Sequence, residues 1–281
     1  MLWIGGGQGA GKTTLSWHLS RANDLPLHPV DLWAYDHQAR MPAADSLDRQ
    51  LARGPEAAAD AFESHSRRRL GLVIGDIAQR GLGRVPAIVE GPQLMPGLAA
   101  QLPPGWGVWL LPDPARTRLV REERLADEQT LAGRPAADNS RARLVSQRDA
   151  ILTSRIRESA VLAGRPIIEV PPSPDWPEIA AAIGSALAKA LAAAPRLATG
   201  SELGRQRRYE NKAADRQGRL WMQAVGLTVM PAYPFGCECG ESGCRATWTA
   251  TPDEYAARSE PDHRLIAHDA PNRDPGHNGL T

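Results

Sequence analysis

The sequence is poor in cysteine, in lysine and in long apolar segments. Its three cysteines, among 281 residues, all lie between residues 237 and 244. A secreted domain held together by disulfides would spread more cysteines along the chain, so these three are expected to bind a metal or to remain free thiols. No apolar run approaches the roughly 20 residues that a membrane-spanning helix needs. The first predicted strand begins at Leu2, which leaves no space for a signal peptide, so we expect a cytoplasmic protein with no membrane partner.

A large excess of charge of one sign is also lacking. The formal net charge is +1 at pH 7, and neither the first 194 residues nor the remainder carries a marked excess. Proteins that bind nucleic acid mainly through charge have strongly basic surfaces, so a nucleic-acid partner is not expected. The composition, 42% hydrophobic and 23% charged, is typical of a globular protein, and the length allows two domains.

Residues 6–13 form the most informative segment. They read Gly-Gly-Gln-Gly-Ala-Gly-Lys-Thr, which matches the phosphate-binding pattern G-x-x-x-x-G-K-[ST] in full. In this pattern glycines let backbone N–H groups turn toward phosphate oxygens, Lys12 reaches the β- and γ-phosphates, and the Thr13 hydroxyl can hold Mg²⁺. Lys12 is one of only three lysines in a chain that otherwise uses arginine. We therefore predict ATP and Mg²⁺ as cofactors, bound by Gly6, Gly7, Gln8, Gly9, Ala10, Gly11, Lys12, Thr13 and Thr14.

Strand-like apolar runs alternate with helical periodicity over the first 194 residues, which is typical of parallel βαβ units. The pattern predicts an α/β fold with a five-stranded parallel sheet and helices on both faces. The expected strands are residues 2–4, a short strand ending at 30–31, and residues 85–90, 108–111 and 166–170. The expected helices are residues 12–23, 55–81, a helix capped by Asp113, 139–163, and a closing helix from Asp175 to about residue 191.

The phosphate loop and the order of the elements after it resemble the nucleoside-monophosphate-kinase-like group of P-loop kinases. Small-molecule kinases such as gluconate kinase, shikimate kinase and chloramphenicol phosphotransferase belong to this group. The resemblance covers residues 1–194 and implies transfer of the γ-phosphate of ATP to a hydroxyl or phosphate of a small-molecule acceptor.

Two carboxylates are expected at the carboxyl ends of neighbouring strands, where ligands of open α/β sheets bind. Asp31 could orient or deprotonate the acceptor hydroxyl, although it could equally cap a following helix. Glu90 could hold Mg²⁺ or its water, and the alternative is a turn residue before Gly91-Pro92.

An arginine-rich segment follows the fourth predicted strand and corresponds to the lid of the kinases that the chain resembles. It contains Arg116, Arg118, Arg121, Arg124 and Arg134. Lid arginines close over the γ-phosphate and neutralise the developing charge. Most of these arginines could instead pair with neighbouring acids on a solvated helix. Arg121 and Arg124 are the expected phosphate contacts.

Residues 33–40 mix aromatic and polar side chains where acceptor recognition is expected. His37 and Arg40 are the predicted substrate contacts, and a covering of the core edge by Trp33 is the alternative. One arginine of the run 67–69 could also face the acceptor, and the sequence does not indicate which.

Residues 195–204 read as a linker to a second, small α+β module at residues 205–281. Its cysteines, Cys237, Cys239 and Cys244, follow a C-x-C-x₄-C pattern that can bind one structural Zn²⁺ with a fourth ligand. His268 is preferred over His263 and His277, and free thiols are the alternative. A capping box at Thr251 and strands at 246–250 and 265–267 are also predicted. This module could bind a protein partner.

The sequence thus predicts an ATP-dependent phosphotransferase. Two alternatives remain. The chain could be an ATP- or GTP-binding regulator that signals through its second module, or a kinase of nucleic acid that contacts its substrate through the basic segment 205–219.

Overall fold

The structure is a computed structural model, and it describes residues 1–131, 139–227, 230–259 and 264–269. Its main body is an α/β fold around a parallel sheet with the strand order β2-β3-β1-β4-β5. The strands are β1 (Leu2–Gly6), β2 (Leu27–Pro29), β3 (Ile88–Glu90), β4 (Gly107–Pro112) and β5 (Ile167–Val170). The predicted five-stranded parallel sheet is confirmed.

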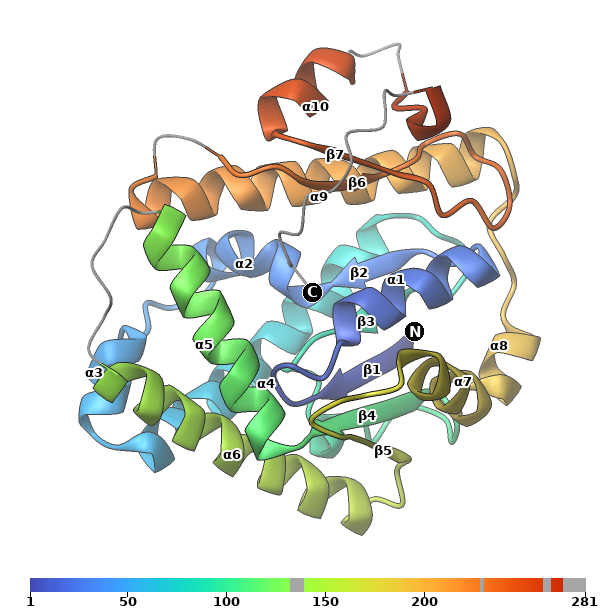
Figure 1. Ribbon diagram of the computed structural model, residues 1–281. Helices are drawn as coiled ribbons and strands as arrows, with labels where there is room; N and C mark the ends of the chain where they lie inside the picture. Colours follow the sequence, from blue (N-terminus) through green and yellow to red (C-terminus); the bar gives the residue numbers. More distant parts are fainter. Residues whose placement is uncertain (132–138, 228–229, 260–263, 270–281) are drawn as a thin grey trace.

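Helices cover both faces of this sheet (Figure 1). Leu2 and Ile4 of β1 face one hydrophobic cluster, and Trp3 faces the other, as the two-residue period of a buried strand requires. The first cluster packs under α1 (Lys12–Asn23), α7 (Trp176–Ala186) and α8 (Ala188–Ala193). The second packs under α4 (Pro55–Gln79) and α6 (Asn139–Leu162).

Several predicted helix boundaries are confirmed at their caps. The Asp113 side chain accepts a hydrogen bond from the Ala115 N–H at 2.7 Å, at the start of α5 (Pro114–Leu131). Asp175 accepts from the Glu178 N–H at 3.1 Å and starts α7. The closing helix, expected to be continuous, is divided at Leu187 into α7 and α8.

Short helical segments lie between the main elements. They are η1 (Val30–Trp33), α2 (Ala34–Arg40), α3 (Leu47–Ala52) and η2 (Pro96–Leu98). The strand expected at residues 85–90 is limited to Ile88–Glu90, because Val85 turns back to Leu82 and Pro86 has no backbone N–H to donate.

The C-terminal part contains a long helix and a small antiparallel sheet. The elements are α9 (Ser201–Val225), β6 (Tyr233–Gly236), β7 (Thr247–Ala250), α10 (Pro252–Arg258) and η3 (Ala267–Asp269). The capping box at Thr251 is present. The strand predicted at 265–267 is wrong, because the Leu265 N–H bonds to the Glu238 side chain and its carbonyl to the Glu238 N–H, which leaves no second strand to continue the ladder.

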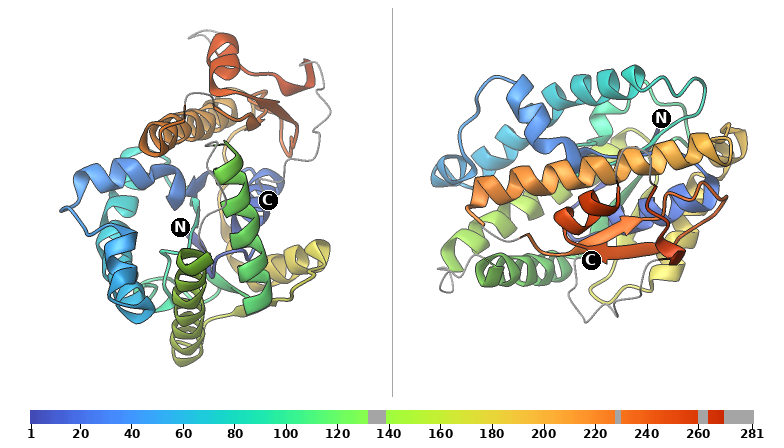
Figure 2. Two further views of the ribbon diagram at one scale, coloured as in Figure 1. Left: turned by 60° about the vertical axis from the view of Figure 1, so that its left-hand side comes forward. Right: turned by 90° about the horizontal axis from the view of Figure 1, so that it is seen from above.

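Helix α9 lies between the main body and the rest of the C-terminal part (Figure 2). It begins at Ser201, inside the predicted linker. None of the helices in the described part of the chain combines the length and the apolar character that a membrane span requires.

Candidate functional site

The end of β1 and the loop after it have backbone geometry that favours glycine. Gly6, Gly9 and Gly11 have φ values of 125°, 81° and 73°. A Cβ atom at Gly11 would lie 2.6 Å from the Trp176 ring, and one at Gly6 would lie 2.0 Å from the Leu110 carbonyl oxygen. The glycines of the sequence pattern are therefore required by the fold itself.

Lys12 starts α1 and turns back over this loop. Its Nζ donates a hydrogen bond to the Gly7 carbonyl at 2.7 Å, and the side chain is buried. Burial lowers the pKa of Lys12, while the nearby charges of Glu90 and Asp31 raise it. The loop lysine and both predicted carboxylates therefore occupy one electrostatic site, at the carboxyl edge of the sheet.

The two carboxylates are held by neighbouring polar side chains. The Thr13 hydroxyl donates to Glu90 Oε1 at 3.1 Å, and Gln93 Nε2 donates to Asp31 Oδ1 at 2.7 Å. Glu90 is opposite Ile4 in the β1–β3 ladder and is only 2% exposed. Its burial, and then the charge of Asp31, raise the pKa of Glu90 to about 7, against the opposing effects of Lys12 and Thr13.

Helix α5 contacts the loop through its first turn. Arg116 Nε donates to the Gly9 carbonyl at 2.8 Å, and the guanidinium lies 4.8 Å from the centre of the Trp176 ring. Thr117 Oγ1 donates to the Gln8 carbonyl at 3.2 Å. The sequence named Arg116 within the lid but gave no signal that separated it from the other lid arginines.

The two arginines selected from the sequence lie further along α5. Arg121 is within 2.7 Å of the buried Asp149 carboxylate of α6. Arg124 is exposed, and the charges of both arginines lower the pKa of Lys12, which places them near the same site. Their role as phosphate contacts stays a prediction, and Arg134 lies outside the described residues.

Among the arginines at 67–69, the structure buries Arg69 and exposes the other two. Arg69 lies on α4 with 8% of its surface exposed, and its Nη2 is 2.9 Å from His65 Nε2. Within the described part of the chain, its Nε has no hydrogen-bond partner and no carboxylate lies within ion-pair distance. Burial lowers its pKa, and the charge of Asp31 opposes that effect. Arg69 is therefore a buried cation whose electrostatic neighbour is Asp31.

His37 and Arg40 are both bound to a carboxylate on α4. His37 Nε2 lies 2.9 Å from Asp76 Oδ2, and Arg40 donates to both oxygens of the same carboxylate at 2.8 and 2.6 Å. His37 is fully buried. Arg40 lines a cavity of about 820 Å³ between α2, α4 and α9, with Trp33 and Tyr209 in its wall. Substrate binding by His37 and Arg40 stays a prediction.

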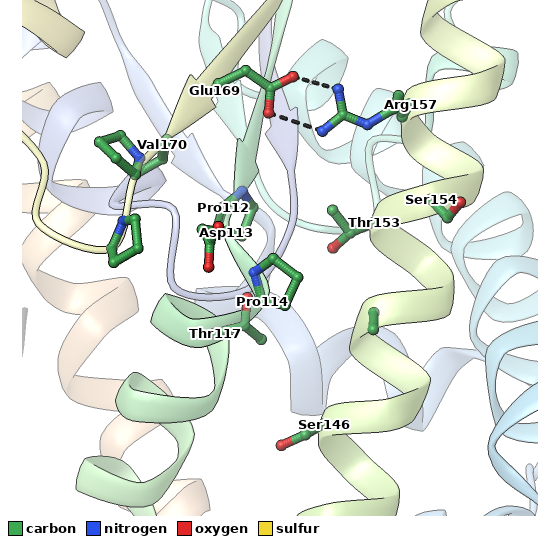
Figure 3. A pocket seen from close by; sticks show the side chains of 13 residues that line it. Pro112, Asp113, Pro114, Thr117, Ser146, Thr153, Ser154, Arg157, Glu169 and Val170 are labelled. Carbon is green, nitrogen blue, oxygen red and sulfur yellow. Dashed lines mark hydrogen bonds and ion pairs between the residues drawn. The ribbon is translucent and has the colours of Figure 1, made fainter.

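A second cavity, of about 410 Å³, lies at the carboxyl ends of β4 and β5 (Figure 3). Its walls come from the start of α5, from α6 and from the segment after β5, and Arg157 pairs with both oxygens of Glu169 at its edge. A Cβ atom at Gly7 would lie 2.8 Å from Thr153 Oγ1, a side chain of this wall. The cavity therefore adjoins the loop of residues 6–13.

The three cysteines and His268 form a cluster in the C-terminal part. One ligand atom from each of Cys237, Cys239, Cys244 and His268 lies within 4.8 Å of the others. His268 Nε2 is 3.4 Å from Cys237 Sγ and 3.7 Å from Cys244 Sγ. Tetrahedral zinc with ordinary bond lengths separates a sulfur and a nitrogen ligand by about 3.5 Å. The cluster can therefore hold a metal such as zinc; the alternative ligands His263 and His277 lie outside the described residues.

Backbone N–H groups point at two of the sulfur atoms. The Glu241 N–H lies 3.4 Å from Cys239 Sγ, and the Ala267 N–H lies 3.3 Å from Cys237 Sγ. Such donors stabilise thiolates, which are the form that binds metal. Without a metal, burial and then the neighbouring thiols raise the pKa of Cys239 to about 12, although the Glu241 N–H opposes this.

The basic face predicted on residues 205–219 is mostly engaged within the protein. Arg207 is fully buried, Arg216 pairs with Asp36, and Arg219 pairs with Asp215 and Asp253. This arrangement does not favour a nucleic-acid surface. No protein-family model matches the chain, and no curated protein shows significant similarity to it.

Proposed function

We propose that residues 1–194 form a P-loop kinase domain that transfers the γ-phosphate of ATP to a small-molecule acceptor. The observation that carries the proposal is the gathering of Lys12, Thr13, Asp31 and Glu90 at the carboxyl edge of the sheet, beside a loop whose backbone geometry favours glycine. A phosphate-binding loop, a lysine, a hydroxyl and a carboxylate are the parts that phosphoryl transfer needs in one place.

In this proposal the N–H groups of residues 7–13 and the Lys12 ammonium hold the phosphates. Thr13 and Glu90 hold Mg²⁺, which supplies positive charge to the β- and γ-phosphates when it is bound. Thr13 and Glu90 are already hydrogen-bonded to each other, so the two side chains are oriented toward a common point. Arg121 and Arg124 neutralise charge that develops on the transferred group.

The acceptor side of the site is built around Asp31. Gln93 orients this carboxylate, which receives the proton of the acceptor hydroxyl or directs that hydroxyl at the phosphorus. We further propose that the acceptor carries a carboxylate or a phosphate bound by Arg69, because a buried guanidinium without a carboxylate partner is costly unless an anion joins it.

The test is acceptor-dependent release of ADP by the full-length protein, with Lys12→Ala as the negative control. Acceptors are compared in matched pairs with and without an anionic group, such as gluconate with glucose and ribose 5-phosphate with ribose. The proposal expects turnover only with anionic members, and Arg69→Gln to raise the KM for the acceptor with little change in the KM for ATP. Turnover with the neutral members alone would contradict the assignment of Arg69.

The alternative is an ATP- or GTP-binding regulator that acts through the C-terminal part. The packing of α9 against η1 and α2, beside the residues that follow Asp31, is the observation that favours it. Tight, magnesium-dependent nucleotide binding without stimulation of ADP release by any acceptor would support this alternative over the kinase.

For the cysteine cluster we propose one structural Zn²⁺ bound by Cys237, Cys239, Cys244 and His268. Three thiolates and an imidazole are a common ligand set of structural zinc, and a module with a two-stranded sheet gains stability from such an ion. Elemental analysis should find one zinc per chain. Equal zinc content and equal melting temperature in Cys239→Ser would refute the site.

A further inference from the structure

The C-terminal end of α1 contacts the loop between Cys239 and Cys244. Asp24 follows the helix, is nine-tenths buried and has a left-handed backbone with φ of 47°. Its carboxylate accepts hydrogen bonds from the Ser242 hydroxyl and, at 3.1 Å, from the Gly243 N–H. Both donors stand between Cys239 and Cys244. The proposed metal ligands therefore fix the two ends of the segment that holds Asp24.

A buried arginine links the same carboxylate to the cluster. Arg207 of α9 is fully buried, with its guanidinium 3.6 Å from the Asp24 carboxylate and 3.8 Å from Cys239 Sγ. Three thiolates and one divalent cation leave a negative charge in excess, so Arg207 faces both the metal-loaded cluster and Asp24, and the charge of Arg21 also lies near the cysteines. Loss of the metal changes the charge of the cluster that Arg207 faces. It thereby changes how strongly Arg207 is attracted to the cysteines relative to the Asp24 carboxylate.

Close backbone packing sets the path of the cysteine loop. The Gly200 N–H donates to the Gly240 carbonyl at 2.8 Å, and a Cβ atom at Gly240 would lie 2.1 Å from the Gly200 carbonyl oxygen. Gly240 has a φ of 78°, which favours glycine. The loop is thus pressed against the start of α9 on one side and against α1 on the other.

We propose that a zinc ion at this cluster holds the far end of the phosphate-loop helix and thereby raises the affinity of the nucleotide site. Helix α1 begins with Lys12 and Thr13 and ends at Asn23, directly before Asp24, so a restraint on its last turn limits how its first turn can move. This inference rests on the proposed zinc and nucleotide sites. Because coupling between two binding sites is reciprocal, bound MgATP also retains the zinc.

The experiment compares the full-length protein loaded with zinc and stripped by a chelator under reducing conditions. It measures amide hydrogen exchange in residues 12–23, MgATP affinity and the rate of zinc release. Stripping should speed exchange in the last turn of α1 and weaken MgATP binding about five- to tenfold. MgATP should slow release of zinc. Equal exchange of α1 with and without zinc would overturn the inference. A zinc-loaded protein whose α1 is protected but which binds no MgATP would refute the proposed kinase and the effect on affinity, and would leave the restraint on α1 established.

Substitutions separate the restraint from the metal itself. Asp24→Ala keeps every metal ligand, so it should retain zinc but show the fast α1 exchange of stripped protein. Ser242→Ala, which removes one of the two hydrogen bonds, provides a milder variant if Asp24→Ala does not fold. Thr251→Ala removes the cap of α10 in the same module and is the matched control, with zinc content and α1 exchange unchanged. Slow α1 exchange in a zinc-loaded Asp24→Ala or Ser242→Ala protein would contradict the restraint.

Discussion

At the scale of single residues, Glu90 combines a buried position with a negative neighbour. Its pKa is raised from 4.5 to about 7, first by burial and then by Asp31. The folded state binds this proton more tightly than the unfolded state does. The contribution of protonated Glu90 to the stability of the fold is therefore complete below about pH 4.5 and is lost as the pH rises through about 7. The shift corresponds to about 3 kcal/mol. A metal ion beside ionised Glu90 would remove this cost.

We therefore expect Glu90→Gln to gain stability relative to the natural protein as the pH rises from 5 to 8, by about 2.5 kcal/mol in the absence of Mg²⁺. Glutamine can still accept the Thr13 hydrogen bond, so the substitution changes charge more than packing. Denaturant unfolding across this pH range measures the effect. If the free energy of unfolding varied with pH in the same way for the two proteins, Glu90 would be ionised in the folded state without a cost in stability.

Arg69 and Arg21 are both buried, but only Arg21 has a carboxylate partner within the described residues, Glu210 at 3.1 Å. Removing one member of a buried ion pair leaves the other uncompensated and costs about 3–5 kcal/mol. Arg21→Met should therefore destabilise the protein by about this amount. Arg69→Met should be neutral or cost much less in the free protein, because Asp31 acts on Arg69 only from beyond ion-pair distance and no described carboxylate is left without a direct partner. Denaturant unfolding of both variants checks the contrast, and equal losses would show that Arg69 has an anionic partner within the fold.

At the scale of elements, the loop of residues 6–13 needs glycine for two separate reasons. Gly11 has a left-handed φ of 73°, and its Cα also faces the Trp176 ring at a distance that leaves no space for a Cβ atom. Gly81 has a similar φ of 63°, but a Cβ atom there would have no neighbour within 4 Å. A substitution at Gly81 therefore tests backbone strain alone, and one at Gly11 tests strain together with steric exclusion.

Alanine at either position should cost about 1–2 kcal/mol in stability from the left-handed backbone alone. Gly11→Ala should in addition displace Trp176 or the loop and abolish magnesium-dependent nucleotide binding. Gly81→Ala should leave that binding intact. Nucleotide titration of both variants, each shown to be folded by circular dichroism, makes the comparison. Unchanged nucleotide affinity in Gly11→Ala would show that this loop does not form the nucleotide site.

Elements with local signals could be predicted from the sequence, and those defined by distant partners could not. The caps at Asp175 and Thr251 are local and are confirmed. The division at Leu187 carries no local signal, since the surrounding alanines and leucines all favour a helix. Strand β6 was not predicted, because its Pro234 is unfavourable inside a sheet. An edge position in a two-stranded sheet nevertheless tolerates proline.

The same distinction applies to the site residues. Lys12 and Glu90 could be placed together because the carboxyl ends of parallel strands share an edge, and the structure brings them together. The partner of His37 and Arg40 is Asp76, which lies in another helix and has no signal in the sequence. Arg116 reaches the loop because of where α5 begins, which residue type alone does not reveal.

At the scale of the whole molecule, α9 covers one edge of the sheet. Strand β2 is the outermost strand on its side, and its Leu27 N–H donates to the Glu210 carboxylate of α9 at 2.9 Å. The same carboxylate pairs with Arg21 of α1. An uncovered strand edge invites pairing with other chains. The main body thus depends on a helix that lies beyond the predicted domain boundary at residue 194.

We therefore expect a fragment of residues 1–194 to be less stable than the full chain and prone to aggregation. Loss of the Glu210 contacts should cost about 3 kcal/mol and lower the melting temperature by about 6 °C or more. A fragment of residues 1–226 keeps α9 and should recover part of the loss, and Glu210→Ala in the full chain should reproduce most of it. Calorimetry and light scattering provide the measurements. A fragment 1–194 that stays monomeric and has the melting temperature of the full chain would establish two independent domains. In that case α9 would belong to the cysteine module and would not stabilise the main body.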